Sequence, residues 1–214
     1  MIAIALAVAF PILQANWNTV LACPRVSSGS VVGTGVVIGV KDGFAYLLTA
    51  NHVATGQTLE VQFSSRKNYP GPAWFANDAS VVACWPDPDL ALVKFPLAKH
   101  EVAVLRLAPA WERPKVFPVS MSSVGVGSGE AAKRRDELIL GNVYVKREGK
   151  GGAFFWKAKK ASESGRSGGP LLDSQGRVIG IAVATRDGSG YFAHHDEIIA
   201  ALKKSGHEWL FVRP

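Results

Sequence analysis

Cysteine is scarce in this 214-residue sequence, which contains only Cys23 and Cys84. No Cys-x-x-Cys pair and no Cys/His ligand spacing is present, so a zinc site has no support. Two interpretations of the cysteines remain open. If the chain is exported they can form one disulfide, which requires Cα atoms within about 7 Å of each other. Otherwise they are two small buried thiols.

Long apolar segments are also missing. The most apolar one, residues 1–15, is shorter than the roughly 20 residues that span a bilayer, so no transmembrane span is expected. Its length suits a signal peptide cleaved after Ala15, although no Lys or Arg precedes it and Leu13 is large for a cleavage site. We therefore expect a signal peptide over 1–15 and export to the periplasm or medium. A buried first helix or strand is the alternative.

Charged residues make up only 19% of the chain and hydrophobic residues 48%, which indicates a folded globular protein. Glycine is abundant, with 22 residues, and favours many turns and short strands. Only 196–204 has a convincing helical pattern. Alternating or β-branched residues predict strands in nine segments: 31–40, 44–49, 59–63, 81–85, 90–95, 138–147, 153–158, 177–184 and 190–193.

A proline-containing stretch at 108–114 divides these segments into two halves. We expect one β unit at 20–108, a second at 115–195, and a C-terminal helix at 196–205. The predicted fold class is therefore all-β, with a single terminal helix.

The tract G-R-S-G-G-P at 165–170 holds a serine among glycines. A serine becomes a nucleophile when a base takes its proton and donors receive the oxyanion that forms. Glycine permits the tight turn that would present Ser167 and aim the N–H groups of Gly165 and Ser167 at one point. The plain alternative is a Gly-Pro turn that happens to carry a serine.

Two further segments supply the groups that such a serine needs. His52 follows the predicted strand 44–49, and Asp89 directly precedes the predicted strand 90–95. With Ser167 they form a set of nucleophile, base and orienting carboxylate, as acyl transfer requires. Asp87 is a rival for the carboxylate, but Asp89 is favoured because it alone adjoins the apolar strand.

Three motifs resemble those of the trypsin-like (chymotrypsin-fold) serine proteases, in their bacterial form related to the HtrA/Deg group. These are T-A-N-H-V at 49–53, D-L-A-L at 89–92 and G-R-S-G-G-P at 165–170. The resemblance covers about residues 25–200. It implies two six-stranded Greek-key β-barrels with an active site in the cleft between them, a polypeptide substrate and no cofactor.

The same resemblance implies the residue roles. His52 would be the general base and then the general acid, Asp89 would orient it, and Ser167 would be the nucleophile. The N–H groups of Gly165 and Ser167 would form the oxyanion hole. The substrate-binding residues would be Ala161, Val183, Ala184, Thr185 and Gly190.

Departures from the family pattern refine this expectation. Arg166 stands where regulated members have an aspartate that receives a freed N-terminus, so zymogen activation of that kind is not expected. Ala161 is apolar where an acidic residue would select Lys or Arg, so small or medium apolar side chains are expected in the pocket. Glu163 is the nearby residue most able to change that preference. Only 34 residues follow Gly180, so none of the PDZ domains attached to HtrA/Deg proteins is expected here.

Two other functional classes are compatible with parts of the sequence. The tract also fits the G-x-S-x-G elbow of α/β-hydrolases, with Asp187 or Asp196 and His207 as partners, but Pro170 opposes the helix that must follow. Only 47 residues remain after Ser167, too few for the rest of such a sheet. A catalytically silent, protease-fold interaction module is the alternative from another class.

The net charge of +7 arises mostly in residues 133–160, where nine basic residues face three acidic ones. Basic and aromatic residues together can indicate nucleic-acid binding. Alternation over 154–160 instead predicts a hairpin with aromatics inward and lysines outward, so no nucleic acid is expected.

His194 and His195 lack a further ligand at metal spacing, so no metal is expected and they are assigned to the turn before the last helix.

Overall fold

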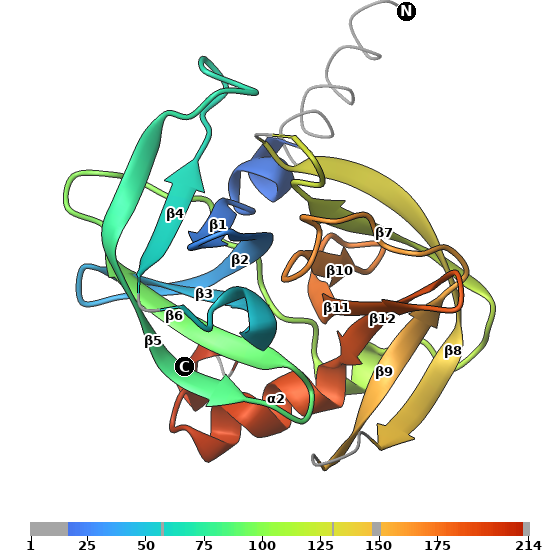
Figure 1. Cartoon of the computed structure of the whole chain (residues 1–214). Helices are drawn as coiled ribbons and strands as arrows, with labels where there is room; N and C mark the ends of the chain where they lie inside the picture. The colour runs from blue at the N-terminus through green and yellow to red at the C-terminus, as the bar shows by residue number, and fades with distance from the viewer. Residues whose placement is uncertain (1–16, 57, 130, 147–150, 212–214) are drawn as a thin grey trace, which may run out of the picture.

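Figure 1 shows a computed structural model of the chain, which describes residues 17–56, 58–129, 131–146 and 151–211. The expected signal peptide at 1–15 lies outside these residues. Within them, no helix has both the length and the apolar character needed to cross a membrane.

Two closed β-barrels lie side by side, and helix α2 (His195–Lys204) packs beneath them in the view of Figure 1. Neighbouring strands in the first barrel follow the order β1-β2-β3-β6-β5-β4. Its six strands are β1 (Arg25–Ser28), β2 (Val31–Lys41), β3 (Phe44–Ala50), β4 (Leu59–Phe63), β5 (Trp74–Trp85) and β6 (Leu90–Pro96).

The second barrel repeats the same order as β7-β8-β9-β12-β11-β10. Its strands are β7 (Val119–Gly125), β8 (Lys133–Lys146), β9 (Gly152–Ala158), β10 (Pro170–Leu172), β11 (Val178–Arg186) and β12 (Ser189–His194). All strand pairs within both barrels are antiparallel. The expected fold class, all-β with two six-stranded barrels and a C-terminal helix, is confirmed.

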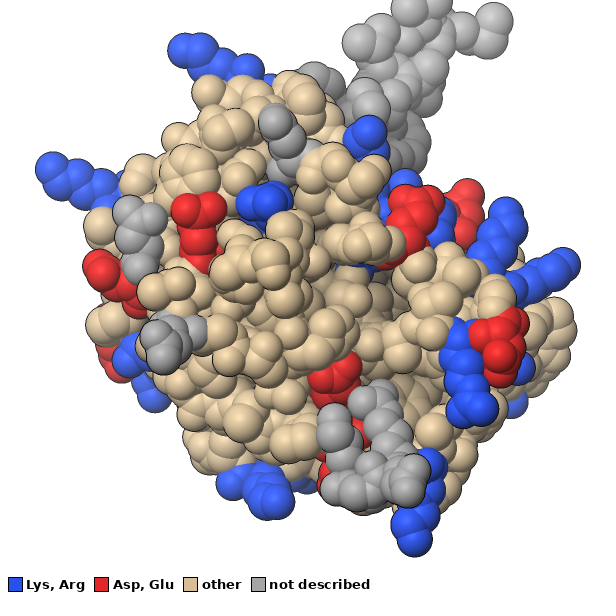
Figure 2. Space-filling model, viewed as in Figure 1, with Lys and Arg blue, Asp and Glu red and all other residues tan. Residues whose placement is uncertain are grey.

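The basic segment forms the expected hairpin, β8–β9, but the expected side-chain alternation in β9 is wrong. Phe155 and Trp156 are both buried, whereas Phe154 is 46% exposed. Consecutive side chains are buried because both faces of β9 are covered: Trp156 packs in the interior of the second barrel, and Phe155 joins the cluster that includes Ile198 of α2. In Figure 2 the basic side chains around this barrel are interspersed with acidic ones.

The two cysteines do not form a disulfide. Both are free thiols, with Cys23 buried and Cys84 exposed on β5. The expectation of two buried thiols therefore holds for Cys23 alone. Burial raises the pKa of the Cys23 thiol, which favours its protonated, unreactive form.

His194 and His195 begin helix α2. His194 Nδ1 accepts a hydrogen bond from the Asp196 N–H at 3.2 Å, which caps the helix, while His195 Nε2 lies 2.6 Å from the Ala108 carbonyl oxygen. A carbonyl only accepts, so His195 must donate from Nε2. Burial lowers the pKa of His194 to about 4, and it also lowers the pKa of His195. Both imidazoles are therefore neutral structural groups near neutral pH.

These two histidines predict a loss of stability in mild acid. In the unfolded chain each imidazole is protonated below its ordinary pKa of 6.5. In the folded chain His194 is protonated only below about pH 4. The free energy of unfolding should therefore fall through this window as pH falls, by about 1.4 kcal/mol per pH unit for His194, and His195 contributes in the same direction. Urea titrations at several pH values measure the slope. His194→Asn keeps a capping side chain and should flatten it; equal slopes for both proteins would contradict the assignment.

Candidate active site

His52 lies in the short 3₁₀ helix η1 (Asn51–Val53), directly after β3. Its backbone N–H donates to Asp89 Oδ1 at 3.0 Å, and its Nδ1 lies 2.7 Å from Asp89 Oδ2. Because the ionised carboxylate only accepts, Nδ1 carries the ring proton and Nε2 is left as a proton acceptor. The His52 side chain is 45% exposed and that of Asp89 only 8%, so the imidazole reaches solvent from a buried anchor.

Asp89 adopts an uncommon backbone conformation, with φ of +59°. Aspartate tolerates this left-handed region better than most residues, and such outliers are often retained at functional sites. The Asp89 carbonyl also accepts the Asn51 N–H at 2.9 Å. Asp89 therefore holds η1 through three hydrogen bonds, two from its side chain and one from its carbonyl. Asp87 lies elsewhere: its Oδ1 accepts the N–H of Gly151 at 2.7 Å, beside the β8–β9 hairpin.

Ser167 lies in the loop between β9 and β10 and is half-buried. Thr34, a fully buried residue of β2, donates its N–H to the Ser167 carbonyl at 2.7 Å. Thr49 Oγ1 in turn donates to the Thr34 carbonyl at 2.7 Å. On the other side, Gly168 donates its N–H to Ala182 of β11 at 2.7 Å. The serine loop is therefore held between the two barrels.

The two glycines that flank this serine are required by geometry. Gly165 has φ of +83°, and a Cβ there would lie 1.9 Å from the Gly127 carbonyl oxygen. Gly168 has φ of +88°, and a Cβ there would lie 1.9 Å from the Thr34 carbonyl oxygen. Thr34 Oγ1 donates to the Gly165 carbonyl at 2.8 Å and thereby orients that peptide group. Among the described residues, the N–H groups of Gly165 and Ser167 donate to no protein acceptor.

The side chains of Ser167 and His52 are brought to the same region without a direct bond. Within the described part of the chain, Ser167 Oγ makes no hydrogen bond to His52. Their segments both lie against Gly33, where an added Cβ would be 2.6 Å from the side chain of Val53, the neighbour of His52, and 2.7 Å from the Ser167 carbonyl oxygen. In serine hydrolases without substrate this side-chain contact is often long.

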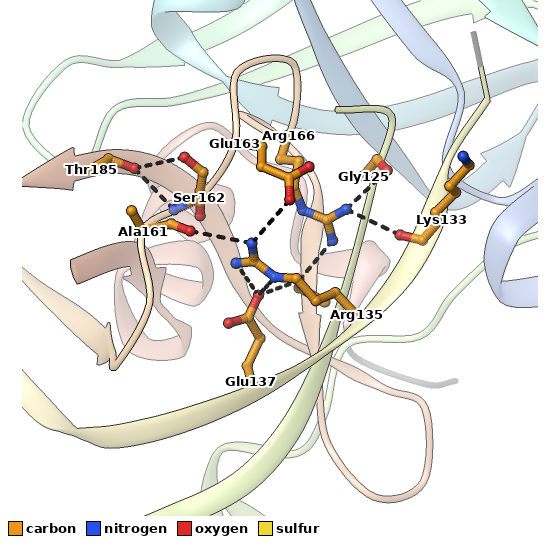
Figure 3. A network of polar contacts seen from close by, with 10 residues as sticks. Gly125, Lys133, Arg135, Glu137, Ala161, Ser162, Glu163, Arg166 and Thr185 are labelled. Atoms are coloured by element: carbon orange, nitrogen blue, oxygen red, sulfur yellow. Dashed lines mark hydrogen bonds and ion pairs between the residues drawn. The ribbon is translucent and has the colours of Figure 1, made fainter. Parts of the chain in front are cut away.

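The expected substrate-binding residues lie on neighbouring segments: Val183, Ala184 and Thr185 on β11, Gly190 on β12, and Ala161 in the loop that follows β9. Thr185 Oγ1 of β11 accepts the Ser162 N–H at 3.1 Å and donates to the Ser162 carbonyl at 3.1 Å. A Cβ on Gly190 of β12 would lie 2.8 Å from the Lys160 carbonyl oxygen, so these segments are in close contact. Glu163 has a 67% exposed side chain, which lies 3.8 Å from Arg135 and is shown beside it in Figure 3.

The last part of β11 is a free edge in the described structure. Its pairing with β12 continues to Arg186↔Ser189, whereas its pairing with β10 ends at Pro170↔Ile181. Ala184 and Thr185 therefore have a strand neighbour on one side only, and the buried Val183 lies in the bulge between Ala182 and Ala184. Such an edge can pair with an extended peptide. The described residues also contain no cluster of three or more His, Cys, Asp or Glu side chains that could hold a metal ion.

Several residues around the serine loop carry no signal in the sequence. Thr34 looks like an ordinary strand residue, yet it bonds to Gly165, Ser167 and the Val126 N–H. Arg135 and Glu137 look like part of a solvated charge run, yet they contact each other below the loop.

Comparisons with known proteins agree with this architecture. Residues 33–181 match the model of the trypsin-like peptidase domain. An uncharacterised protein of Sinorhizobium fredii, y4bJ, is 30% identical over 168 residues, which cover 78% of this chain and 24% of that protein. A probable periplasmic serine endoprotease DegP-like of Chlamydia pneumoniae is 28% identical over 173 residues, or 77% of this chain and 31% of that protein. The chain thus spans under a third of the length of these relatives.

Solved structures show the same fold. The active form of the Rv3671c protease from M. tuberculosis superposes with a TM-score of 0.71 at 20% identity, covering 95% of this chain and 86% of that one. A serine endoprotease from Yersinia pestis has a TM-score of 0.67 at 18% identity, covering 90% of this chain and 65% of that one. With the family match over most of the barrels, the protein belongs to the trypsin-like peptidase domain family and is related to its HtrA/Deg-type members.

Proposed function

We propose that this chain is a serine endopeptidase that hydrolyses peptide bonds through an acyl-enzyme on Ser167. The observation that carries the proposal is the double contact of Asp89 with His52, at 2.7 Å to Nδ1 and 3.0 Å to the backbone N–H. An exposed imidazole anchored by a buried carboxylate is the arrangement that a catalytic base requires.

The proposed reaction uses each of these groups in turn. His52 Nε2 removes the proton from Ser167 Oγ as Oγ attacks the substrate carbonyl, and Asp89 stabilises the imidazolium that forms. The N–H groups of Gly165 and Ser167 receive the oxyanion. His52 then protonates the amine, which leaves. Water next attacks the acyl carbonyl while His52 Nε2 takes its proton, and His52 returns a proton to Ser167 Oγ as the acyl–oxygen bond breaks. Arg166 occupies the position that needs an N-terminal partner in regulated members, so the enzyme is competent once folded.

The test is labelling of the purified protein with a fluorophosphonate, which reacts with an activated serine. Labelling should occur in the wild type and disappear in Ser167→Ala and His52→Ala, with circular dichroism showing that each variant is folded. A folded wild type that stays unlabelled would reject the proposal and favour the silent interaction module with a protease fold.

The substrate is a polypeptide that pairs with the free edge of β11 and places a small or medium apolar side chain beside Ala161. Two observations support this preference. The Thr185 hydroxyl bonds to the backbone N–H and carbonyl of Ser162, and the Glu163 carboxylate lies 3.8 Å from Arg135 Nη1. Neither arrangement offers a free carboxylate at the base of the pocket.

A peptide-library profile measures this preference. Residues such as alanine and valine should be enriched before the cleaved bond, with lysine and arginine cleaved about 10- to 200-fold more slowly. The cause is the cost of burying a cation without a partner. A profile dominated by lysine or arginine would overturn the assignment.

We also propose that the protein is exported. The apolar segment at 1–15 and the similarity to a protein named as a periplasmic endoprotease support this location. Fractionation of cells that express the full chain, followed by N-terminal sequencing, tests it.

A further inference from the structure

Charged side chains are buried directly beneath the serine loop. Arg166, next to the proposed nucleophile, is only 5% exposed, and the Glu137 side chain is 1% exposed. Burying a charge costs free energy unless partners replace the lost water. The contacts of these residues therefore reveal what their burial achieves.

Arg166 fastens one end of the loop to β7 and β8. Its Nη1 donates to the carbonyls of Gly125 at 3.2 Å and Lys133 at 3.3 Å, which are the last residue of β7 and the first of β8. Its Nη2 donates to Ser123 Oγ at 2.9 Å. Figure 3 shows the guanidinium directed toward Gly125 and Lys133.

Glu137 and Arg135 continue the chain of contacts to the other end of the loop. Ser123 Oγ donates to Glu137 Oε1 at 2.6 Å, and the same oxygen receives Arg135 Nε at 2.9 Å and Nη2 at 2.6 Å. Arg135 Nη1 then donates to the Ala161 carbonyl at 3.2 Å. We call the four side chains of Arg166, Ser123, Glu137 and Arg135 the arginine network.

The arginine network thus joins Ala161 and Arg166, the two ends of the segment that contains Gly165. Directional bonds of this kind specify one conformation of a loop, whereas an apolar side chain of similar size would fill the space without aligning any peptide group. The pKa of Arg166 reflects both its burial and its charged neighbours. Burial and the charge of Arg135 lower the pKa of Arg166, and the nearby Glu137 opposes this effect.

We infer that Arg166, Glu137 and Arg135 are positioning residues: through the arginine network they hold residues 161–167 in the conformation that presents the Gly165 and Ser167 N–H groups to the substrate. This role rests on the proposed function. All four side chains of the arginine network belong to the second barrel. The network can therefore order the loop without a contact from another molecule.

The experiment compares Arg166→Met and Glu137→Gln with the wild type by amide hydrogen exchange and by peptide hydrolysis. Arg177→Met is the matched control. Arg177 also forms ion pairs, with Glu112 and Asp173, but neither partner belongs to the serine loop. Amide hydrogens in peptides covering 161–168 should exchange faster in the two network variants. Their exchange rates should stay unchanged in the control. In the same variants kcat should fall by about 10- to 100-fold with little change in KM, since small displacements of reacting groups cost this much.

Each outcome decides a separate question. Unchanged exchange over 161–168 in folded variants would overturn the inference whether or not the wild type hydrolyses peptides. Faster exchange with unchanged kcat would reduce the network to a purely structural role and also overturn it. A third outcome combines faster exchange in the variants with a wild type that neither reacts with the fluorophosphonate nor hydrolyses peptides. It would reject the proposed function while upholding the anchoring of the loop. If Arg166→Met fails to fold, the nearly isosteric Glu137→Gln carries the test.

Discussion

Substitution of Asp89 by asparagine is expected to lower kcat for peptide hydrolysis by about 10⁴-fold. The amide keeps the size of the carboxylate, but its NH₂ group can donate to His52 Nδ1 and stabilise the wrong tautomer, with the proton on Nε2. That nitrogen could then no longer accept the serine proton. The charge that stabilises the imidazolium in the transition state would also be lost.

The matched control is Asp87→Asn, two residues away. Asp87 contacts the Gly151 N–H and not His52, so its amide should leave kcat within about twofold. Steady-state hydrolysis of one peptide by the two variants at equal concentration measures the difference. Full activity of Asp89→Asn together with a loss in Asp87→Asn would reverse the assignment of the orienting carboxylate.

Replacing Gly165 by alanine is the second large effect that we expect, with kcat lowered on the order of 10²- to 10³-fold. The new Cβ would lie 1.9 Å from the Gly127 carbonyl oxygen at a φ of +83°, so the peptide must move. That movement withdraws the Gly165 N–H from the position that receives the oxyanion. Because the donor acts mainly in the transition state, KM should change little.

Gly176→Ala is the control for backbone strain alone. Gly176 has a similar φ of +75°, but no atom lies within 4 Å of a Cβ placed there. This variant should lose about 1 kcal/mol of stability and keep its kcat. If Gly165→Ala were folded and retained the wild-type kcat, Gly165 would have no part in an oxyanion hole.

The strands of the first barrel show how far local patterns reach. The segments predicted at 31–40, 44–49 and 90–95 correspond to β2, β3 and β6 within one residue at each end. Glycine turns and alternating apolar residues define these strands sharply. The same reasoning missed β1, β7, β10 and the first seven residues of β5, where alternation is weak or the strand is too short to show it.

The charged start of β8 was missed for a different reason. Residues 133–137 lie outside the predicted strand at 138–147, because their charged side chains, which are usually exposed, show no apolar alternation. In the barrel this segment pairs with β7, so Arg135 and Glu137 point beneath the serine loop rather than into water. Their burial depends on Ser123 and Arg166, which stand elsewhere in the chain.

The sequence by itself determined the all-β class and most strand positions, because periodicity and turn residues act locally. It also indicated the three side chains on which the proposed function rests, through motifs that resemble those of the trypsin-like proteases. Only the tertiary structure decided that Asp89 contacts His52, that Thr34 bonds to Gly165 from 131 residues away, and that Arg166 bonds to Ser123 from 43 residues away. A local pattern indicates whether a side chain faces the interior. Which residue it meets there depends on how the closed barrels bring distant strands together.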